Sequence, residues 1–555
     1  MNFLSPAHRH SFLPRFSGAK LGAAVVAIFS LLFSASCWQR ETNVHRGNAE
    51  QILHRGIGPE IPDLDPQLAV GASDYNVLIA LFEGLVTEDP VDLHPVPGVA
   101  EKWEPSPDGL RYTFHLRENA KWSNGEPVTA QDFVRSYERM LSPSLAADNA
   151  YMLYVFQNAE AFHKGTLKDF AEVGVHAIDS HTLRLTLEHP APYLLPMLTQ
   201  MAFMPVHLPT IEKFGPAAQR GNAWARPGRM VSNGAFQLTE WKTGQKIVVT
   251  KSPTYWDAAT VKLTEIDFYP YESRDAEERA FRAGQLHLTE ALPSGKVETY
   301  RRNEPALLRI DPYLATEFYR INITRPFLND RRVRRAMSLA IDRKALAENI
   351  LRGGQKPAFS LTPPNTAGYT ATAGTEYNPK AARALLAEAG YPGGKGAPAI
   401  EVLINQLESH RAVGEAVQEM WRKELGLQVK LVAQENKMLL TARTAGDYQV
   451  LRSIWSGDFI DPLSFLGIFT STSGNNYTSW ANRTYDQLVF EAARVAEPSA
   501  RNTLLAKAEA LLLDEAPIIP LYHYTHVFVI QPSVKNWHPT LLDHHPYKYV
   551  YLQAP

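Results

Sequence analysis

The sequence predicts an α/β fold with more than one domain. Strand-like and helix-like segments alternate through the C-terminal half, an order typical of α/β domains. The chain has 555 residues, which exceeds one typical domain and indicates two or three. With 45% hydrophobic residues the chain can build a large core, and its net charge of −2 gives no electrostatic reason to expect a nucleic-acid partner.

The N-terminal segment has the features of a bacterial export signal. An apolar, small-residue stretch over 21–36 follows several basic residues and is too short to span a membrane comfortably. The run 33–37 (FSASC) resembles a lipobox, in which Cys37 is lipidated and becomes the mature N-terminus; cleavage near Ala35 is the alternative. We therefore expect a lipoprotein-type signal segment over 1–37, a polar linker over 38–47, and a protein of the periplasm or cell envelope.

Cys37 is the only cysteine of the chain. The remainder therefore cannot form an internal disulfide or a cysteine-ligated zinc site. Beyond residue 40 the sequence contains no apolar run long enough for a membrane span.

A strand and a helix are predicted in the N-terminal half. An alternating pattern over 112–116 follows the turn signal 107–109 (PDG) and predicts a strand. Further along, Thr129 is a helix N-cap with Asp132 three residues later, much as in a capping box. We expect a helix over 130–140 with one apolar side, formed by Phe133, Val134, Tyr137 and Met140.

The C-terminal half shows clearer helix signals. Asn378 is an N-cap, Pro379 takes the first helical position, and Gly390 ends that helix. The following segments predict strands and helices in alternation: strands over 400–404, 428–432 and 449–455, and helices over 409–425 and 438–444. Alternating units of this length predict a largely parallel sheet, whose ligands bind beyond the carboxyl ends of its strands.

Asp458 comes just after the last of these strands. The run 451–458 (LRSIWSGD) is strand-like and apolar until it ends in this carboxylate. An ionised carboxylate at the tip of a buried strand is costly unless a cation meets it. Asp458 is therefore a candidate for binding a cationic group, although an aspartate in this position can also simply cap a loop.

Several ordered motifs resemble one known family. From about residue 50 to the C-terminus, the chain is similar to the extracellular solute-binding proteins of family 5, and within them to the oligopeptide-binding proteins of bacterial peptide ABC importers. The matching blocks are 82–85 (FEGL), 96–103 (VPGVAEKW), 114–117 (FHLR), 120–133 (AKWSNGEPVTAQDF), 233–236 (NGAF), 329–334 (NDRRVR) and 385–391 (LLAEAGY).

The resemblance implies the two-lobed type II fold of periplasmic binding proteins, with a hinge of two strands and an additional third domain. Carried onto this sequence, the first lobe comprises 48–95, 225–313 and 527–555, the additional domain 96–224, and the second lobe 314–526. A peptide would be enclosed between the lobes. Its backbone would pair with protein strands without regard to its side chains, and the segments that match this role are Glu83, Gly84 and Leu85 in the first lobe and Trp455, Ser456 and Gly457 in the second.

The resemblance also implies roles for single residues. Asp458 matches the acceptor of the peptide's α-ammonium, and Arg452 matches a residue that pairs with that carboxylate. Arg443 and His410 match positions that meet the peptide's terminal carboxylate. Two departures bear on ligand choice: Asn436 replaces a tryptophan and Arg320 replaces an acidic group, which predicts a preference for acidic or polar peptides. The alternative for Arg452 is a structural ion pair elsewhere, and the alternatives for Arg443 and His410 are a surface arginine and an ordinary half-buried histidine.

Other classes of function find little support. The sequence has no Gly-x-Ser-x-Gly and no His-Glu-x-x-His motif, so we expect no enzyme. Some family members carry nickel or haem, and the candidate ligands here are His523, His526, His544 and His545. We expect structural or surface roles for these histidines, and neither a metal nor a cofactor. A murein-peptide receptor or a sensing receptor on the same fold stays open.

The expected partners are short peptides, an inner-membrane ABC permease and, if Cys37 is lipidated, the membrane. We expect a monomer.

Overall fold

The computed structural model describes residues 42–69 and 71–553, without the side chains of Ala72 and Asn436. Cys37 and the expected signal segment lie outside this part. Helix α2 (Asn43–Glu50) occupies residues that we had expected in the linker. The reason is a tertiary contact, because the amide of Val44 donates to the carbonyl of Gly284 at 3.0 Å. Within the segment expected as a linker, the chain is therefore helical from residue 43 onward.

The first lobe is built on a four-stranded sheet with the order β1-β10-β9-β8. β1 is parallel to β10, and the other neighbours are antiparallel. Its strands are β1 (Ile52–Gly56), β8 (Phe236–Lys242), β9 (Lys246–Lys251) and β10 (Glu265–Tyr269), and its helices are α3 (Ala72–Leu81), α7 (Leu208–Glu212), α8 (Arg274–Arg282) and α9 (Val297–Asn303). The hairpin of β2 (Val86–Glu88) with β3 (Pro95–Pro97) and the pair β17 (Val534–Lys535) and β18 (Tyr551–Leu552) complete this part.

The additional domain has an antiparallel sheet with the order β4-β5-β7-β6. Both segments predicted in this part are confirmed. The carboxylate of Asp132 accepts the amide proton of Thr129 at 2.7 Å, as expected for the capping box. The elements are β4 (Ala100–Pro105), β5 (Arg111–Leu116), α4 (Ala130–Leu141), a 3₁₀ helix η1 (Ala150–Val155), α5 (Ala159–His163), β6 (Val175–Asp179), β7 (Thr182–Thr186) and α6 (Leu194–Met197).

The hydrophobic clusters divide the chain slightly differently from our expectation. Met201, Met204, Leu208 and Ile211 pack in the cluster of the first lobe, although we expected the additional domain to extend to residue 224. Leu85 packs in the cluster of the additional domain. Near this border, residues that are close together in the sequence therefore contribute to different cores.

The second lobe contains a six-stranded sheet with the order β12-β16-β11-β15-β13-β14. The strands predicted over 400–404, 428–432 and 449–455 do run parallel, but our prediction of a largely parallel sheet is wrong for the sheet as a whole. Only β13 with β14 and β13 with β15 run parallel, because β11 and β16 enter antiparallel to their neighbours. The strands are β11 (Leu308–Ile321), β12 (Lys356–Pro357), β13 (Ile400–Asn405), β14 (Val429–Gln434), β15 (Val450–Ser456) and β16 (Ile518–Val529).

The helices predicted in this lobe are confirmed. The side chain of Asn378 accepts the amide proton of Ala381, and Gly426 ends α13 in a left-handed conformation with φ 69°. The helices are α10 (Arg331–Leu339), α11 (Arg343–Ala345), α12 (Pro379–Glu388), α13 (Glu408–Leu425), α14 (Asn436–Ala445), α15 (Leu463–Leu466), α16 (Arg483–Ala492) and α17 (Pro498–Glu515).

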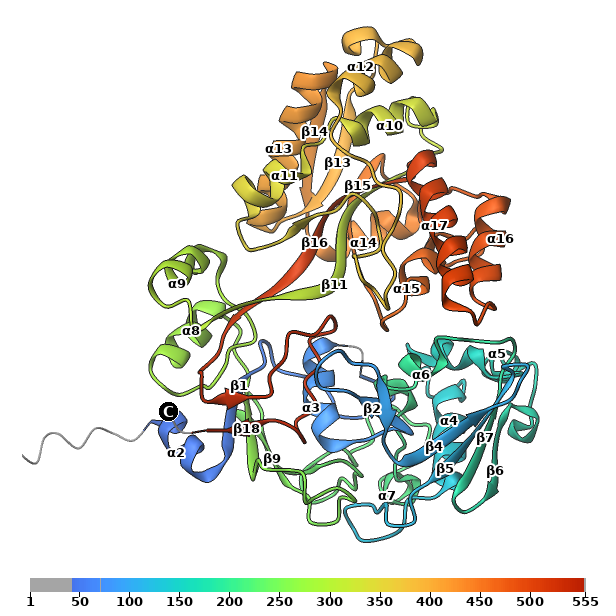
Figure 1. The fold of residues 1–555 in the computed structure, drawn as a ribbon, viewed down its shortest axis with the longest axis vertical. Coiled ribbons are helices and arrows are strands. Elements are labelled where there is room, and N and C mark those ends of the chain that lie inside the picture. The colour runs from blue at the N-terminus through green and yellow to red at the C-terminus, as the bar shows by residue number, and fades with distance from the viewer. Residues whose placement is uncertain (1–41, 70, 554–555) are drawn as a thin grey trace, which may run out of the picture. The chain divides into compact units, whose positions relative to one another are not determined.

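Two long strands join the lobes. β11 and β16 lie side by side along almost their whole lengths (Figure 1). At one end Thr289 of the first lobe donates its amide proton to Val529 of β16 at 3.0 Å, and at the other end both strands lie inside the second-lobe sheet. Two strands thus connect the lobes, as the resemblance implied for the hinge.

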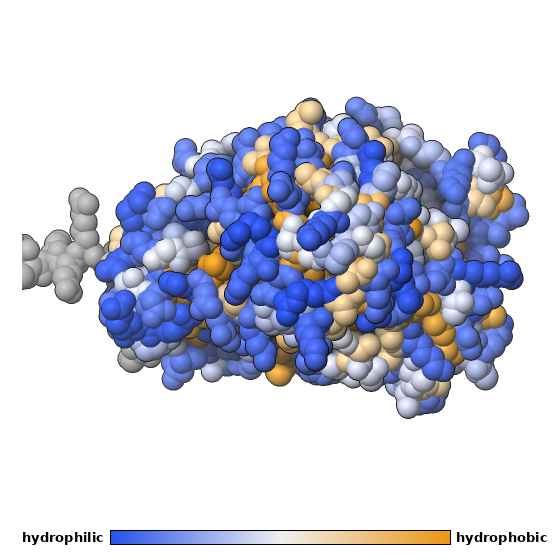
Figure 2. Space-filling view, turned by 90° about the horizontal axis from the view of Figure 1, so that it is seen from above, coloured by the Kyte–Doolittle hydropathy of each residue, from blue (hydrophilic) through white to orange (hydrophobic). Residues whose placement is uncertain are grey.

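The face shown in Figure 2 is mostly hydrophilic, with small, separate hydrophobic groups. Within residues 42–69 and 71–553, no helix combines the length and the apolar character that a membrane span needs.

Candidate ligand-binding site

Asp458 lies just beyond the carboxyl end of β15, as predicted. The amide of Gly457 donates to the carbonyl of Leu314 at 2.8 Å, and the amide of Asp458 donates to Oγ of Ser464 at 2.9 Å. These bonds hold the backbone of Asp458 between β11 and α15. Its carboxylate therefore has a fixed position at the edge of the second lobe.

The carboxylate of Asp458 has no cationic partner in the described part of the chain. Its Oδ2 accepts a hydrogen bond from the hydroxyl of Tyr151, at 3.3 Å, and burial raises the pKa of the carboxyl to about 6. A carboxylate in this state gains from a cation that replaces its lost water. This is the property that the sequence predicted for Asp458.

A buried ion pair anchors the loop that carries Asp458. Both guanidinium Nη atoms of Arg501 donate to the carboxylate of Asp461, at 2.7 and 2.8 Å, and both side chains are buried. Such a bidentate pair fixes direction as well as distance. Arg501 on α17 thus limits the movement of the loop three residues away from Asp458.

Asp458 lines a cavity of about 240 Å³ together with side chains of the additional domain. The ring of Tyr193 stacks on Phe459 with a centroid distance of 5.7 Å, and Phe459 is buried in the cluster of that domain. The cavity combines aromatic walls with one carboxylate. It is suited to a cationic group that carries an apolar substituent.

The edge of β15 near Asp458 is open. On one side β15 pairs with β11 from Val450 to Ser456, but on the other side β13 pairs only with Val450 and Leu451. Beyond Leu451, no backbone hydrogen bond engages the outer edge of β15 within the described residues. Alternate backbone groups over 452–456 therefore face outward and can pair with an extended ligand.

The first-lobe segment 83–85 is largely engaged within the protein. Asn233 donates to the carbonyl of Glu83 at 2.8 Å, Val99 donates to Gly84, and Ala100 donates to Leu85, both at 3.0 Å. No described group accepts the amide protons of Gly84 and Leu85. Of the backbone groups in this segment, the amides of Gly84 and Leu85 can thus be offered to a ligand's backbone.

The side chain of Glu83 is a structural carboxylate. It is 6% exposed, accepts a hydrogen bond from Trp256 Nε1 at 2.6 Å and from the hydroxyl of Tyr255, and lies 3.8 Å from Lys548 Nζ. Burial raises its pKa. Its partners hold the segment 83–85 in place.

Arg452 pairs with Glu317 and not with Asp458, so this prediction is wrong. Nε and Nη2 of Arg452 donate to the two carboxylate oxygens of Glu317, each at 2.5 Å. The physical reason is strand geometry: Arg452 and Asp458 are six residues apart along an extended chain, whereas Glu317 is a diagonal neighbour on the adjacent strand β11. Tyr524 completes the cluster, because its hydroxyl donates to Glu317 at 2.9 Å.

His410 belongs to the same cluster and is neutral. Arg452 donates to its Nε2 at 3.1 Å, so its Nδ1 carries the proton and donates to the side chain of Asn405. Burial and the neighbouring guanidinium lower its pKa to about 4. A contact between His410 and a peptide's carboxylate stays a prediction, and any such contact would involve a neutral ring.

Arg443 and Arg320 lie together at another part of the second lobe. The guanidinium carbons of Arg443 and Arg320 lie 4.5 and 5.4 Å from the ring centroid of Tyr477. The backbone of Asn436 begins α14, but its side chain lies outside the described part of the structure. The predicted site residues of the second lobe thus form three groups: Asp458 with the open edge, Arg452 with His410, and Arg443 with Arg320.

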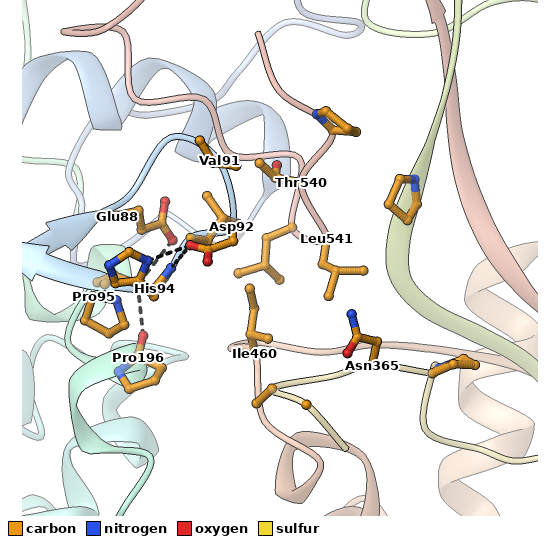
Figure 3. A pocket seen from close by; sticks show the side chains of 18 residues that line it. Glu88, Val91, Asp92, His94, Pro95, Pro196, Asn365, Ile460, Thr540 and Leu541 are labelled. Carbon is orange, nitrogen blue, oxygen red and sulfur yellow. Dashed lines mark hydrogen bonds and ion pairs between the residues drawn. The ribbon is translucent and has the colours of Figure 1, made fainter. Parts of the chain in front are cut away.

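A larger cavity, of about 740 Å³, contains none of the predicted site residues. Its walls come from the loop after β2, from 364–368 and from 539–542, and Ile460 reaches it from the loop of Asp458 (Figure 3). Its polar side chains include Asp92 and His94, which pair with each other at 2.6 Å. This cavity adjoins the candidate site through Ile460 and is lined by residues of both lobes.

The four histidines considered for metal binding have partners within the protein. His523 contacts Thr316, and His544 pairs with Glu88 at 2.8 Å. The others, His526 and His545, both contact Asp543, at 2.8 and 3.0 Å. The ligand atoms of Glu290, His526 and Asp543 do lie within 4.8 Å of one another. However, Arg55 approaches Glu290 to 3.3 Å, and a cation there disfavours a metal ion.

Comparison with known proteins places these features in a family. Residues 94–477 match the model of the bacterial extracellular solute-binding proteins, family 5 Middle. The chain belongs to this family. The predicted two-lobed α/β fold of its members is thereby confirmed.

Relatives of this family 5 protein are similar over most of its length. The periplasmic oligopeptide-binding protein OppA of Escherichia coli (strain K12) is 36% identical over 497 residues, which are 88% of this chain and 90% of OppA. The solved structure of the Escherichia coli murein tripeptide-binding protein MppA has a TM-score of 0.76 and 35% identity, covering 91% of this chain and 99% of MppA. Haemophilus influenzae OppA in complex with RPPGFSPFR has a TM-score of 0.74 and 30% identity, covering 91% and 99%.

Sequence reasoning missed three residues that lie in or beside the candidate site. Tyr151 lies on the 3₁₀ helix η1, whose short turns leave no periodic pattern to detect. Tyr193 precedes a four-residue helix and carries no signal either. Glu317 lies in a strand pattern, and an acidic residue in an otherwise buried strand is the one signal that would have suggested an ion pair.

Proposed function

We propose that this family 5 protein captures short peptides outside the cytoplasm and delivers them to an inner-membrane ABC permease. The observation that carries the proposal is the half-buried carboxylate of Asp458, which has no cationic partner among the described residues and lies at the end of an open strand edge. A peptide in extended form has the complementary features. Its α-ammonium meets the carboxylate, and its backbone meets the edge.

Main-chain pairing makes the recognition tolerant of sequence. The open edge of β15 and the amides of Gly84 and Leu85 interact only with the ligand's backbone. Side chains of the ligand then enter the surrounding space, of which the cavity beside Asp458 is one part. Peptides of varied sequence are therefore expected ligands.

Ligand binding would favour closure of the lobes about β11 and β16. A ligand held by both lobes stabilises only the form in which both can touch it. The closed form would be presented to the permease, and no bond would be made or broken. We also propose a monomer, export by the segment 1–37, and anchoring to the membrane through a lipid on Cys37.

The names of similar proteins support a peptide ligand. OppA of Escherichia coli is an oligopeptide-binding protein, and MppA of the same organism is a murein peptide-binding protein. A murein peptide also has the chemistry of a peptide backbone, so uptake of nutrients and recycling of cell wall are both compatible with the site.

The test is identification of the ligand. The mature chain, purified from cells, would be examined by native mass spectrometry, then unfolded, refolded without ligand, and titrated with tri- and tetrapeptides by calorimetry. We expect a co-purified mass that fragments as a peptide, and binding of one peptide per chain. Absence of binding for all peptides, together with a bound solute of another class, would contradict the proposal.

A further inference from the structure

The segment 538–546 leaves the core of the first lobe, reaches the second lobe and returns. It begins after Trp537 and ends before Tyr547, and both of these side chains are buried in the hydrophobic cluster of the first lobe. At its middle, Leu541 and Leu542 pack against the hydrophobic cluster of the second lobe. This segment, which we call the strap, therefore contacts both cores in addition to the two strands that join the lobes.

The C-terminal half of the strap is fixed on the side of the first lobe. His544 pairs with the buried carboxylate of Glu88 at 2.8 Å, and its ring stacks on Tyr75 with a centroid distance of 3.8 Å. Asp543 contacts His526 of β16 at 2.8 Å. Burial lowers the pKa of His526, but the carboxylate of Asp543 raises it, to about 9, so this contact is an ion pair at neutral pH. The neighbouring residues Leu541 and Leu542 therefore start from a fixed base.

The tip of the strap holds an irregular part of the hinge strand β11. The pairing of β11 with β16 changes register between Pro312 and Thr316, so residues 313–315 bulge out of this ladder. The amide of Leu314, within the bulge, donates to the carbonyl of Leu541 at 2.7 Å. A bulge interrupts the ladder and bends the strand. The strap thus contacts β11 where its pairing with β16 is weakest.

Leu314 also connects the strap to the loop of Asp458. Its carbonyl accepts the amide proton of Gly457 at 2.8 Å, and its side chain packs so closely that a Cβ atom on Gly457 would lie 2.6 Å from it. Two backbone hydrogen bonds therefore lead from Leu541 through Leu314 to Gly457, the residue before Asp458. Leu541 also lines the same cavity as Ile460, from the loop of Asp458 (Figure 3).

The strap makes these contacts while the loop of Asp458 touches the additional domain. The hydroxyl of Tyr151 donates to Asp458 at 3.3 Å, and the ring of Tyr193 stacks on Phe459. Both contacts and the hydrogen bond between Leu314 and Leu541 exist in one arrangement of the chain. Whatever stabilises one of them therefore stabilises that arrangement.

We propose that the strap holds the two lobes in this arrangement and positions the carboxylate of Asp458, with Leu541 and Leu542 as its positioning residues. The part that concerns the ligand rests on the proposed function, whereas the restraint on the lobes does not. Without the contacts of the tip, the lobes would rotate more freely about β11 and β16. A peptide would then bind only the fraction of molecules in which Asp458 is correctly placed, and its affinity would fall by that fraction.

The test replaces the apolar tip of the strap. Leu541→Ser combined with Leu542→Ser removes its contacts with the second lobe, and both side chains are only partly buried, so we expect the variant to fold. The matched control combines Leu488→Ser with Leu504→Ser. These two leucines of α16 and α17 are also partly buried against the same cluster but lie wholly within the second lobe.

The first measurements are made without ligand. We expect amide hydrogen exchange over 312–316 and 456–459 to become about tenfold faster in the strap variant, because its local opening costs less. Small-angle scattering should show a larger radius of gyration for the same variant. The control should show neither change. If the double variant does not fold, Leu541→Ser alone is compared with Leu488→Ser.

The second measurement uses a tripeptide with a free amino terminus. The strap variant should release it about 3- to 10-fold faster than the natural protein, and the control should release it at the natural rate. If the natural protein binds no peptide, the proposed function fails, and exchange and scattering alone decide on the strap. If the strap variant and the control agree in exchange over 456–459 and in radius of gyration, the strap is refuted whether or not peptides bind.

Discussion

The hydroxyl of Tyr151 donates a hydrogen bond to Oδ2 of Asp458 at 3.3 Å. Tyr151 belongs to the additional domain and Asp458 to the loop after β15, so this bond connects two parts of the chain that flank one cavity. It also supplies the carboxylate with a neutral donor where a cation would bind better.

Peptide binding should weaken in acid. Because burial raises the pKa of Asp458 to about 6, the carboxyl takes up a proton as pH falls through 6, and a neutral acid cannot hold an ammonium group. The dissociation constant should rise by up to about tenfold per pH unit below 6. Tyr151→Phe removes a hydrogen bond that favours the ionised form, so calorimetry should place its midpoint at higher pH. A dissociation constant that is flat from pH 7 to pH 5 would contradict this assignment.

Without ligand, Asp458→Asn should stabilise the protein at neutral pH. The pKa in the folded state lies above the ordinary value of 3.8, so this carboxyl contributes most to stability below 3.8, and that contribution is lost as pH rises towards 6. Thermal melting at pH 7.5 should therefore show a higher midpoint for the variant, and the difference should disappear near pH 3.5. A lower midpoint at pH 7.5 would indicate that Asp458 already has a cationic partner.

Glu317→Gln should strongly destabilise the second lobe. Arg452 and Glu317 are 11% and 1% exposed, so removal of one charge leaves the other buried and unpaired. A loss of about 3 to 5 kcal/mol in the free energy of unfolding is expected for such a change. The double variant Glu317→Gln with Arg452→Gln should regain part of it. Urea unfolding measures both, and a loss below about 1 kcal/mol for the single variant would show that the pair is solvated.

Gly457→Ala should displace the loop of Asp458. A Cβ atom at this position would lie 2.6 Å from a methyl carbon of Leu314 and 3.0 Å from the ring of Phe465. Overpacking of this kind costs about 1 to 3 kcal/mol, and the shift should also weaken peptide binding. Gly295→Ala is the control, because nothing lies within 4 Å of its Cβ position. Equal affinities for the two variants would mean that the loop adapts without moving the carboxylate.

The local features of the fold could be predicted from sequence. Asn378, Pro379 and Gly426 mark helix ends through contacts within a few residues, and the structure has these helices. The antiparallel pairing within the second-lobe sheet could not be predicted. It depends on β11 pairing with β15 and β16, which are more than 100 and 190 residues away along the chain, and no local pattern encodes that pairing.

The site was predictable in part for the same reason. Asp458 stands out because a strand pattern ends in a carboxylate, which is a local signal. The partner of Arg452 depends on the register between β15 and β11, and the approach of Tyr151 depends on how a 3₁₀ helix packs. The open edge of β15 exists because β13 pairs with only two of its residues, and no local pattern in the sequence indicates where that pairing stops.

The central claim is that Asp458 holds the α-ammonium of a bound peptide. Its most direct test is calorimetric titration of one tripeptide with a free or an acetylated amino terminus, against the natural protein and Asp458→Asn. The account predicts that the variant binds the free peptide about 10- to 100-fold more weakly and the acetylated peptide with nearly unchanged affinity. Equal losses for both peptides would contradict it and would show that Asp458 supports its loop without holding the ligand.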